Sequence, residues 1–323
     1  MILVANAGSS SLKLSAVAED ESSAHVEALA GAPAGVTAVA HRIVHGGQRF
    51  RDPVVVDDAV RGEIEALDEL APLHNAVQVK VIDEARRLLP DIPHVAVFDT
   101  AFHATIPAVA AAYAVPRAWA DDWGVRRYGF HGLSVQWAAD RVRVSRLIVC
   151  HLGAGCSVTA VRDGSSVDTT MGFSPLEGVP MATRSGSLDP AVPLFLIRTG
   201  RLTVDEVAAA LERESGLLGL SGISSRVEEL ERSGDAAAAH ALAVFAYRVA
   251  IAVASMAVPL DGVDAIAFTG GVGERSEAIR AAVCARLGFL GVGSESVAIH
   301  VIEAREDVVA AREARRVIDG ELR

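Results

Sequence analysis

Short apolar runs alternate with turns of small residues along the chain. Residues 1–6 form an apolar run, residues 7–11 are small, and residues 12–17 alternate between apolar and polar positions. An apolar run, a small-residue turn and an alternating run are typical of a β-hairpin. The same order recurs at residues 145–161. The pattern therefore predicts two domain cores built on one plan, with a period far too long for a solenoid.

The rest of the chain is expected to alternate between strands and helices, which is typical of the α/β class. Further strands are predicted at residues 36–44, 94–98, 264–269 and 297–302. Helices are predicted at residues 57–70, 76–89, 190–198, 203–213, 236–257 and 306–318, with another beginning near Ser276. The Ala- and Gly-rich residues 30–38 are expected to form a short surface connection.

One stretch has the length and composition of a membrane span. Residues 241–260 are almost wholly apolar, but Arg248 interrupts them, and Pro259 and Asp261 close the run. A charged residue in the middle of a membrane costs about 2.5–3.5 kcal/mol on insertion scales. We therefore expect a buried core helix and no membrane partner. Residues 1–10 lack the basic region of a signal peptide.

Composition narrows the function classes. The 323 residues suggest two domains, and 51% hydrophobic with 22% charged residues excludes a disordered chain. The net charge of −11 argues against nucleic acid or an anionic membrane surface as the main partner. Three cysteines without a CxxC pair fit a reduced, cytoplasmic protein without a disulfide or zinc framework.

Three junctions between a strand and a turn share small residues, at residues 6–11, 151–155 and 269–273. Small residues let backbone N–H groups approach an anion closely, and such nests hold phosphate oxygens. The carboxyl ends of strands are also where α/β sheets bind ligands. Any one junction alone is better explained as a tight turn, but three in one chain favour a nucleotide site. Neither a P-loop nor a dinucleotide fingerprint is present.

A phosphate site without a P-loop must obtain its cations elsewhere, and Lys13, Arg42 and Arg184 are the candidates. Arginine offers paired donors for a carboxylate or phosphate, although a surface ion pair is the alternative for any single arginine. Asp99 follows an apolar strand, where either a catalytic or metal-positioning carboxylate or a helix N-cap would lie.

Six histidines lie beside Gly, Arg or Asn in short turn-like motifs. They are His41, His45, His74, His103, His131 and His151. One such histidine would be a hydrogen-bonded core residue, but their repetition predicts that at least two face a ligand. No histidine or cysteine spacing supports a zinc site.

Taken together, these motifs resemble the acetate kinases, in the acetokinase branch of the superfamily of sugar kinases, heat-shock ATPases and actin. The stretches that carry the resemblance are NAGSSSLKL (6–14), HRIVHGG (41–47), LAPLHN (70–75), VAVFDTAFHATIP (95–107), RRYGFHGLS (126–134), HLGAGCSV (151–158), MGFSPLEGVPMATRSGSLDP (171–190), SGLLGLSGISS (215–225) and FTGGVGE (268–274). They follow the order of the family and span nearly the whole chain, which looks shorter than typical members before Arg42 and between His131 and His151.

The resemblance implies an α/β fold of two duplicated RNase H-like (actin-like ATPase) domains with an active-site cleft between them. The first domain would comprise residues 1–100 with the terminal helix 307–323, and the second residues 101–306. The resemblance also implies a homodimer and reversible, direct in-line transfer of the γ-phosphoryl group of ATP to acetate, giving acetyl phosphate and ADP. Mg²⁺ would be the cofactor, with Mn²⁺ as a substitute.

The resemblance also assigns roles to catalytic residues. Arg42 would hold the acetate carboxylate, and Arg184 would bracket the transferring phosphoryl group. His131 would donate to an equatorial oxygen in the transition state, and Asp99 would orient the nucleophile and the metal. In-line transfer depends on such positioning and on compensation of the charge on the equatorial oxygens.

By the same resemblance, Asn6 and Glu306 would hold the metal, with Asp307 as the alternative to Glu306. A small apolar cup for the acetyl group would be lined by Val44, Leu73, Phe130 and Pro175. The phosphates and the nucleotide would contact Lys13, Ser9, Ser11, His151, Leu152, Gly153, Ala154, Gly155, Arg226, Val227, Glu228, Gly271, Val272, Gly273, Glu274 and Arg275. One added methylene changes selectivity by only about 1–3 kcal/mol, so a kinase for propionate or another short carboxylate is the alternative.

Three positions depart from the family pattern, and all lie on the nucleotide side. Ala154 replaces the usual Asn of HLGNG, residues 226–228 replace an Asp-x-Arg sequence, and Arg275 replaces an Asn. We expect an altered nucleotide affinity or base preference, with pyrophosphate as an alternative donor. A non-catalytic member that binds a nucleotide is the alternative from another class. The presence of Asn6, Arg42, Asp99, His131 and Arg184 in one chain opposes it.

Overall fold

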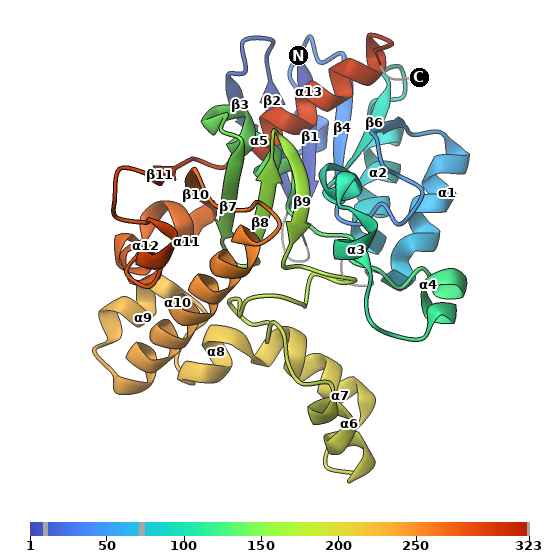
Figure 1. Ribbon diagram of the computed structural model, residues 1–323. Coiled ribbons are helices and arrows are strands. Elements are labelled where there is room, and N and C mark those ends of the chain that lie inside the picture. The colour runs from blue at the N-terminus through green and yellow to red at the C-terminus, as the bar shows by residue number, and fades with distance from the viewer. Residues whose placement is uncertain (9–11, 71–74, 322–323) are drawn as a thin grey trace. The chain divides into compact units, whose positions relative to one another are not determined.

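The computed structural model describes residues 1–8, 12–70 and 75–321 (Figure 1). The chain divides into two compact units, and three segments make up the first. Unit 1 comprises Met1–Ala104, Phe130–Trp137 and Arg305–Arg323, and unit 2 comprises Thr105–Gly129 and Ala138–Ala304. The division differs from the expected one chiefly at residues 130–137, which return to unit 1. They do so because Gly132 N–H donates a hydrogen bond to the carbonyl of Asp99, at 3.0 Å.

Unit 1 is built on a mixed sheet with the order β3-β2-β1-β4-β6-β5. Its strands are β1 (Ile2–Ala7), β2 (Leu12–Val17), β3 (Ser23–Val26), β4 (Ala38–Ile43), β5 (Val54–Val55) and β6 (His94–Phe98). Its helices are α1 (Asp58–Ala66), α2 (Asn75–Leu88) and α13 (Glu306–Ile318), and it shares α5 (Gly132–Val142) with unit 2. β1 pairs antiparallel with β2 and parallel with β4, and β4 pairs parallel with β6.

Strand alternation decides which side chains of this sheet can form a site. Leu3, Ala5 and Ile43 pack in two core clusters with residues of α1 and α2. Because successive side chains point to opposite faces, Asn6 and Arg42 lie on the other face. That face is covered by α13, which contacts β1, β4 and β6 (Figure 1). The first residue of α13 is Glu306.

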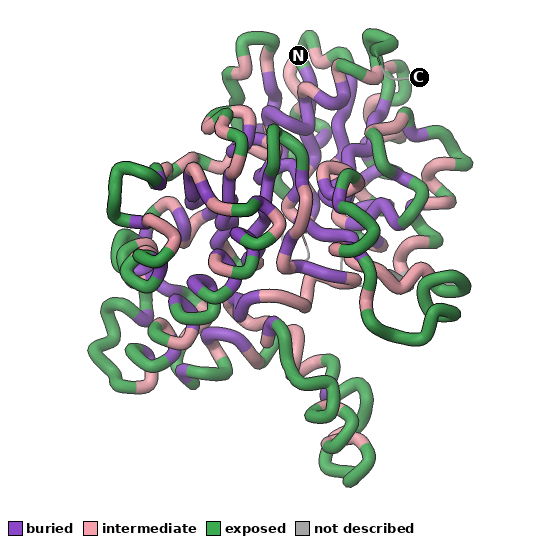
Figure 2. The backbone as a smooth tube through the Cα atoms, viewed as in Figure 1, coloured by how far each residue is buried: buried purple, intermediate pink, exposed green. Residues whose placement is uncertain are grey.

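Unit 2 repeats this plan with the sheet order β11-β10-β7-β8-β9. Its strands are β7 (Arg146–Leu152), β8 (Cys156–Arg162), β9 (Ser165–Thr169), β10 (Ala265–Thr269) and β11 (Ala298–Val301). Strands β7, β8 and β9 form an antiparallel meander as β1, β2 and β3 do, and β10 and β11 extend it in parallel as β4 and β6 do. The duplication expected from the sequence is therefore present, and Figure 2 shows the central strands of each sheet as buried, whereas the edge strands β3 and β11 are mostly exposed.

The helices of unit 2 are α3 (Ala108–Ala111), α4 (Arg117–Trp123), α6 (Ala191–Arg198), α7 (Val204–Ala209), α8 (Gly216–Ser221), α9 (Val227–Ser233), α10 (Ala236–Ala257), α11 (Gly270–Arg275) and α12 (Glu277–Cys284). By length and composition α10 could cross a membrane, and 44% of its most apolar window is buried. Its buried residues include Phe245, Val249 and Val253, and the helix contacts β7 and β8. It is thus a core helix, as we expected from the charged Arg248 within its apolar run.

A pair of stacked, buried histidines comes from the neighbouring strands β4 and β6. His41 Nε2 and His94 Nδ1 share a hydrogen bond of 2.9 Å, and the rings stack with centroids 5.2 Å apart. Burial, the neighbouring His94 and Arg86 lower the pKa of His41 to about 3. Burial also lowers the pKa of His94. These histidines therefore belong to the core in their neutral form.

We predict that acid destabilises the protein through this pair. The unfolded chain takes up the His41 proton near pH 6.5, whereas the folded state resists it down to about pH 3. The folded-state pKa is thus depressed, so the unfolded state binds more protons between these values and stability falls as the pH falls. Denaturant unfolding of His41→Gln should show a pH slope smaller by up to about 1.4 kcal/mol per pH unit.

The exposed His25 on β3 provides the control, since His25→Gln should leave the slope at its wild-type value. An unchanged slope in His41→Gln would contradict the prediction.

Candidate active site

Parallel pairing brings three polar side chains to one edge of the sheet in unit 1. Asn6 on β1 pairs in register with Arg42 on β4, and Asp99 follows β6, whose Phe98 pairs with Ile43. Asp99 N–H donates to the carbonyl of Ile43 at 2.9 Å, which extends the parallel pairing by one residue. The carboxyl ends of neighbouring parallel strands are the usual ligand-binding edge of an α/β sheet.

Arg42 is the centre of this cluster. Its Nε and Nη2 donate to the two carboxylate oxygens of Asp99 at 2.8 and 2.5 Å. Its Nη1 donates to Asn6 Oδ1 at 2.9 Å and lies 3.3 Å from Glu306 Oε2. The Arg42 side chain is 16% exposed and that of Asp99 only 1%. Arg42 therefore forms a largely buried, bidentate ion pair with Asp99. The sequence left a helix N-cap as the alternative role for Asp99, and the ion pair with Arg42 is what the structure contains.

The geometry distinguishes the two carboxylates at the start of α13. Glu306 Oε2 accepts from Asn6 Nδ2 at 3.4 Å and faces Arg42. Asp307 Oδ1 accepts instead from Nε of its neighbour Arg305 at 3.1 Å. Glu306, and not Asp307, therefore joins the cluster with Asn6.

Burial and charge oppose each other in this cluster. Burial raises the pKa of Asp99, the Arg42 guanidinium only partly offsets this, and Glu306 raises it further. Burial disfavours the charged form of Arg42, but Asp99 and Glu306 more than compensate and raise its pKa. Arg42 thus stays protonated at every working pH.

His131 reaches the cluster through its backbone. Its N–H donates to the Asp99 carboxylate, which favours the ionised form. His131 has φ of 61°, and Gly132 follows it at the start of α5. A Cβ at residue 132 would lie 2.1 Å from the carbonyl oxygen of Asp99, so only glycine allows this approach.

The oxygen donors Asn6, Asp99 and Glu306 suit a hard cation such as Mg²⁺. Within the described ranges, no three His, Cys, Asp or Glu residues are grouped as a metal site. That is compatible with Mg²⁺, which proteins commonly bind through one or two carboxylates together with substrate phosphates. The residues present therefore fit a metal whose remaining ligands come from a phosphate substrate.

In unit 2, two of the small-residue junctions lie side by side. The β7–β8 turn is closed by Gly153 N–H donating to Gly155 O at 2.9 Å. β10 pairs parallel with β7, with Thr269 opposite His151, and α11 begins directly after β10. Gly270 has φ of +76°, and a Cβ there would lie 2.8 Å from the carbonyl of Leu152. The glycine at this position allows the two backbones to meet.

A cavity of about 510 Å³ opens beside these turns. It is lined by Gly153, Ala154, Ala182, Leu217, Ser225, Arg226, Val227, Glu228, Glu231, Arg232, Gly271, Val272, Arg275 and Ser276. All three positions that depart from the family pattern are on this wall. Arg226 pairs there with Glu228 and Glu229 at 3.5 and 3.3 Å. Sequence reasoning missed Glu231 and Arg232, which come from α9 and carry no motif.

Other residues assigned to the nucleotide lie off this wall. Leu152 is fully buried, Gly273 packs against Phe268, and Glu274 Oε1 accepts from Ala304 N–H at 3.0 Å. Lys13 pairs with Asn6 across β1 and β2 and is exposed, so the two share a face of the unit 1 sheet. Ser9 and Ser11 lie outside the described residues.

The residues expected to line the acetyl cup are assigned to different units. Val44 and Phe130 belong to unit 1, where Phe130 is buried against the ring of His45. Pro175 belongs to unit 2, and Leu73 lies outside the described residues.

Several of the six histidines named from the sequence lie in the protein interior and make internal hydrogen bonds. Besides His41, His45 Nδ1 accepts from Gly47 N–H at 2.9 Å, and His103 Nε2 lies 2.9 Å from the carbonyl of Phe130. Burial lowers the pKa of His103 to about 4. His74 lies outside the described residues, so His131 and His151 remain the histidines beside the candidate sites.

Comparisons with known proteins identify the family of the chain. A sequence profile described as Acetokinase family matches residues 29–319. The chain belongs to the acetokinase family. It is 48% identical to an acetate kinase from Lachnoclostridium phytofermentans over 272 residues, 81% of this chain and 69% of that protein. An acetate kinase from Deinococcus radiodurans is 49% identical over 273 residues, with the same coverage.

Solved structures of the family share the fold. A propionate kinase from Francisella tularensis has a TM-score of 0.88 and 33% identity, covering 97% of this chain and 98% of that one. An acetate kinase from Porphyromonas gingivalis has a TM-score of 0.86 and 30% identity, covering 98% and 99%. The protein is thus a kinase that transfers a phosphoryl group to a carboxylate, with the two-domain actin-like ATPase fold.

We predict that Gly132→Ala displaces Asp99 and so disturbs the cluster around Arg42. The added Cβ would overlap the carbonyl oxygen of Asp99 at 2.1 Å and Phe102 Cβ at 2.9 Å, so the end of β6 must shift. Overpacking of this kind costs about 1–3 kcal/mol, and the displaced Asp99 should lower kcat. Thermal unfolding and the rate of phosphoryl transfer provide the measurements.

Gly62→Ala on α1 is the matched control, because nothing lies within 4 Å of its Cβ position. It should stabilise the helix by about 0.5–1 kcal/mol with unchanged kcat. Equal activity in both variants would contradict the placement of Gly132.

Proposed function

We propose that this acetokinase-family enzyme transfers the γ-phosphoryl group of ATP to acetate, giving acetyl phosphate and ADP. An acetate oxygen attacks the γ-phosphorus in line, and the bond from that phosphorus to the bridging β,γ-oxygen breaks. The observation that carries the proposal is the buried Arg42 between Asp99, Asn6 and Glu306 at the carboxyl edge of a parallel sheet. A planar guanidinium there suits a carboxylate substrate.

Each cluster residue has a proposed task. Arg42 binds and orients the acetate carboxylate, and Asp99 holds the Arg42 guanidinium in place through its two bonds. His131 donates to an equatorial oxygen of the transferring group, and Arg184 of unit 2 brackets the same group. These contacts would compensate charge that develops on the phosphoryl oxygens, where electrostatic stabilisation is most effective.

Mg²⁺ is the proposed cofactor, with Mn²⁺ as a substitute. When bound, it would neutralise the charge of the phosphates. Asn6 and Glu306 would hold it, because both place an oxygen in the cluster and Glu306 is 18% exposed, whereas Asp99 is almost fully buried. Metal-free enzyme should therefore be inactive.

The donor is proposed to be a nucleotide rather than pyrophosphate. The 510 Å³ cavity beside the β7–β8 turn lies within the usual size range of ligand pockets and exceeds what a pyrophosphate needs. Arg226, Glu228 and Arg275 replace the family residues on its wall, which supports an altered base preference. On the acceptor side, the likeness to a propionate kinase makes propionate the second candidate.

We expect acetyl phosphate to form with acetate, Mg²⁺ and ATP, more slowly with GTP, and not with pyrophosphate. Propionate should be used about 10- to 200-fold less efficiently, as one extra methylene in a tight apolar cup predicts. Arg184→Ala should reduce kcat by about 10²–10³-fold, the usual loss for one such donor, with unchanged thermal unfolding. A coupled assay over these donors and acceptors measures all of this.

ATP binding without any phosphoryl transfer would instead favour the non-catalytic alternative. Faster turnover with propionate than with acetate would show that propionate, the second candidate, is the preferred acceptor.

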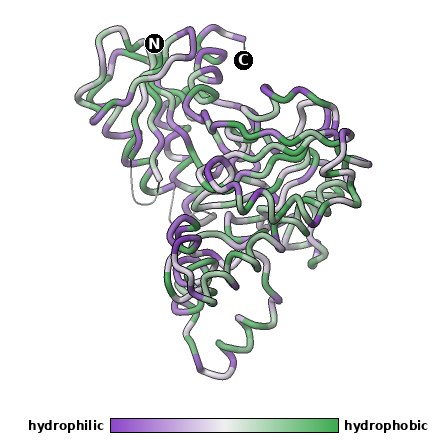
Figure 3. The backbone as a smooth tube through the Cα atoms, turned by 90° about the vertical axis from the view of Figure 1, so that its left-hand side faces the viewer, coloured by the Kyte–Doolittle hydropathy of each residue, from purple (hydrophilic) through white to green (hydrophobic). Residues whose placement is uncertain are grey.

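The protein is also proposed to be a homodimer that associates through unit 2. The helices α6 and α7 are exposed over most of their length (Figure 2), yet they carry hydrophobic residues (Figure 3). Leu194 and Phe195 on α6 and Val204 on α7 are 48%, 52% and 64% exposed. Tyr247 and Ile251 extend this apolar character onto α10, at 52% and 44% exposure. Exposed apolar surface of this kind is typical of protein interfaces.

We predict that Phe195→Glu weakens the dimer. Light scattering coupled to size-exclusion chromatography should give the dimer mass for the wild type and a concentration-dependent shift toward the monomer for the variant. Val109→Glu, at an 88% exposed position elsewhere in unit 2, is the control and should remain dimeric. A monomeric wild type would refute the interface.

A further inference from the structure

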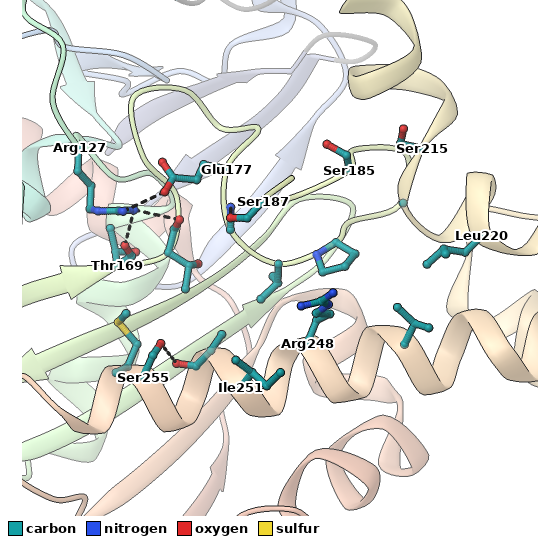
Figure 4. A pocket seen from close by; sticks show the side chains of 18 of the residues that line it. Arg127, Thr169, Glu177, Ser185, Ser187, Ser215, Leu220, Arg248, Ile251 and Ser255 are labelled. Carbon is teal, nitrogen blue, oxygen red and sulfur yellow. Dashed lines mark hydrogen bonds and ion pairs between the residues drawn. The ribbon is translucent and has the colours of Figure 1, made fainter. Parts of the chain in front are cut away.

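A second ionic cluster in unit 2 surrounds Arg127, a residue for which the sequence suggested no role. Its Nη1 donates to the carbonyls of Thr169, Thr170 and Met171 at 2.9, 3.1 and 3.2 Å. Its Nη2 donates to Glu177 Oε1 at 3.0 Å (Figure 4). The Arg127 side chain is only 17% exposed. Four acceptors on one largely buried guanidinium make it a strong fixed point for the chain after β9.

Tyr113 completes the cluster. Its hydroxyl donates to Glu177 Oε2 and accepts from Phe173 N–H at 2.9 Å. Burial and the Glu177 carboxylate raise the pKa of Tyr113, so the hydroxyl remains a donor. A Cβ at Gly172 would lie 1.7 Å from Glu177 Oε2 and 1.9 Å from the Tyr113 hydroxyl. The cluster therefore depends on a glycine in the segment it holds.

That segment, residues 171–187, carries Arg184 and has no regular structure. No helix or strand lies between Thr169 and Ala191. The Arg184 Nη1 donates to the carbonyl of Pro175 at 3.2 Å, two residues before Glu177. Ser187 N–H donates to Gly178 O at 2.8 Å and closes the loop directly after Glu177. The Arg184 guanidinium is thus supported by the stretch of chain that Glu177 anchors, together with Met181 Sδ at 3.7 Å.

Packing holds only part of this segment: Met171, Val179 and Met181 are buried, but the residues around Glu177 and Ser185 border a cavity. A cavity of about 750 Å³ lies against the segment and is lined by Glu177, Gly178, Ser185 and Ser187 on one side. On the other side Arg248 and Ile251 project from α10 (Figure 4). Where the cavity borders the segment, close-packed neighbours are missing, so hydrogen bonds and ion pairs contribute more of the support there.

We infer that Arg127, Glu177 and Tyr113 are positioning residues that fix the Arg184 guanidinium for phosphoryl transfer. The inference rests on the proposed function of Arg184. A misplacement of about 1 Å in a group that acts on the transition state can cost about 10²-fold in rate. Loss of the cluster should therefore reduce kcat while substrate affinity changes little.

The test compares Glu177→Gln in two backgrounds. Alone, it should lower kcat about 10²-fold with the KM for ATP within twofold of the wild type. In the Arg184→Ala background it should cost no more than twofold, because there is no guanidinium left to position. Tyr113→Phe, which keeps the Arg127–Glu177 ion pair, should lose less activity than Glu177→Gln and provides a milder variant if that one does not fold.

Asp264→Asn is the matched control. It breaks the Arg146–Asp264 pair, also in unit 2, in which Arg146 Nε and Nη2 contact Asp264 Oδ1 at 2.9 and 2.5 Å. It should lower the thermal unfolding temperature without changing kcat. Hydrogen–deuterium exchange gives a readout independent of activity, since Glu177→Gln should speed exchange in residues 171–187 and Asp264→Asn should not.

Unchanged exchange in residues 171–187 of both Glu177→Gln and Tyr113→Phe would overturn the inference. So would an equal loss of activity from Glu177→Gln in the wild-type and Arg184→Ala backgrounds. A wild type that makes no acetyl phosphate would refute the proposed function instead. The exchange measurement would then still decide whether the cluster fixes the segment.

Discussion

The bidentate pair between Arg42 and Asp99 is the interaction on which the candidate site depends. Two charges taken from water cost several kcal/mol each, and good geometry with further hydrogen bonds must offset this. Here Asn6 and Glu306 complete the partners of Arg42, and the His131 N–H completes those of Asp99. Every one of these groups sits on a strand end or a helix start, so the sheet itself holds the geometry.

The same constraint explains why the chain crosses between units. α13 supplies Glu306 from the far end of the sequence, and the start of α5 supplies the His131 N–H. Gly132 makes the second approach sterically feasible. Unit 1 therefore brings together segments near residues 6, 42, 99, 131 and 306. Their convergence supplies the hydrogen bonds that stabilise the buried charges of Arg42 and Asp99.

The two units use one topology for different chemistry. In unit 1 the carboxyl edge of the sheet bears charged side chains, whereas in unit 2 it bears glycine turns that expose backbone N–H groups. A guanidinium suits a carboxylate, and a glycine turn suits a phosphate. Under the proposed function, the duplication would separate an acceptor half from a donor half, and all three departures from the family pattern lie in unit 2.

The local pattern of apolar and polar residues was sufficient to predict much of the secondary structure. The strand at residues 94–98 and the helices at 236–257 and 306–318 have the bounds that the sequence predicted, because each has a clear period or a continuous apolar run. It was insufficient for α11, whose glycines disfavour a helix in isolation. There the pairing of β10 with β7 imposes the conformation, including φ of +76° at Gly270.

By itself, the sequence determined the α/β class, the duplication, the family and most of the residues around Arg42. Only the tertiary structure decided that Glu306 rather than Asp307 joins the cluster, and that His41 and His103 belong to the core. It alone revealed the Arg127 cluster, because the sequence assigned no role to Arg127, Glu177 or Tyr113. The reason is that hydrogen-bond partners such as His94 for His41 are distant along the chain, and no local period encodes them.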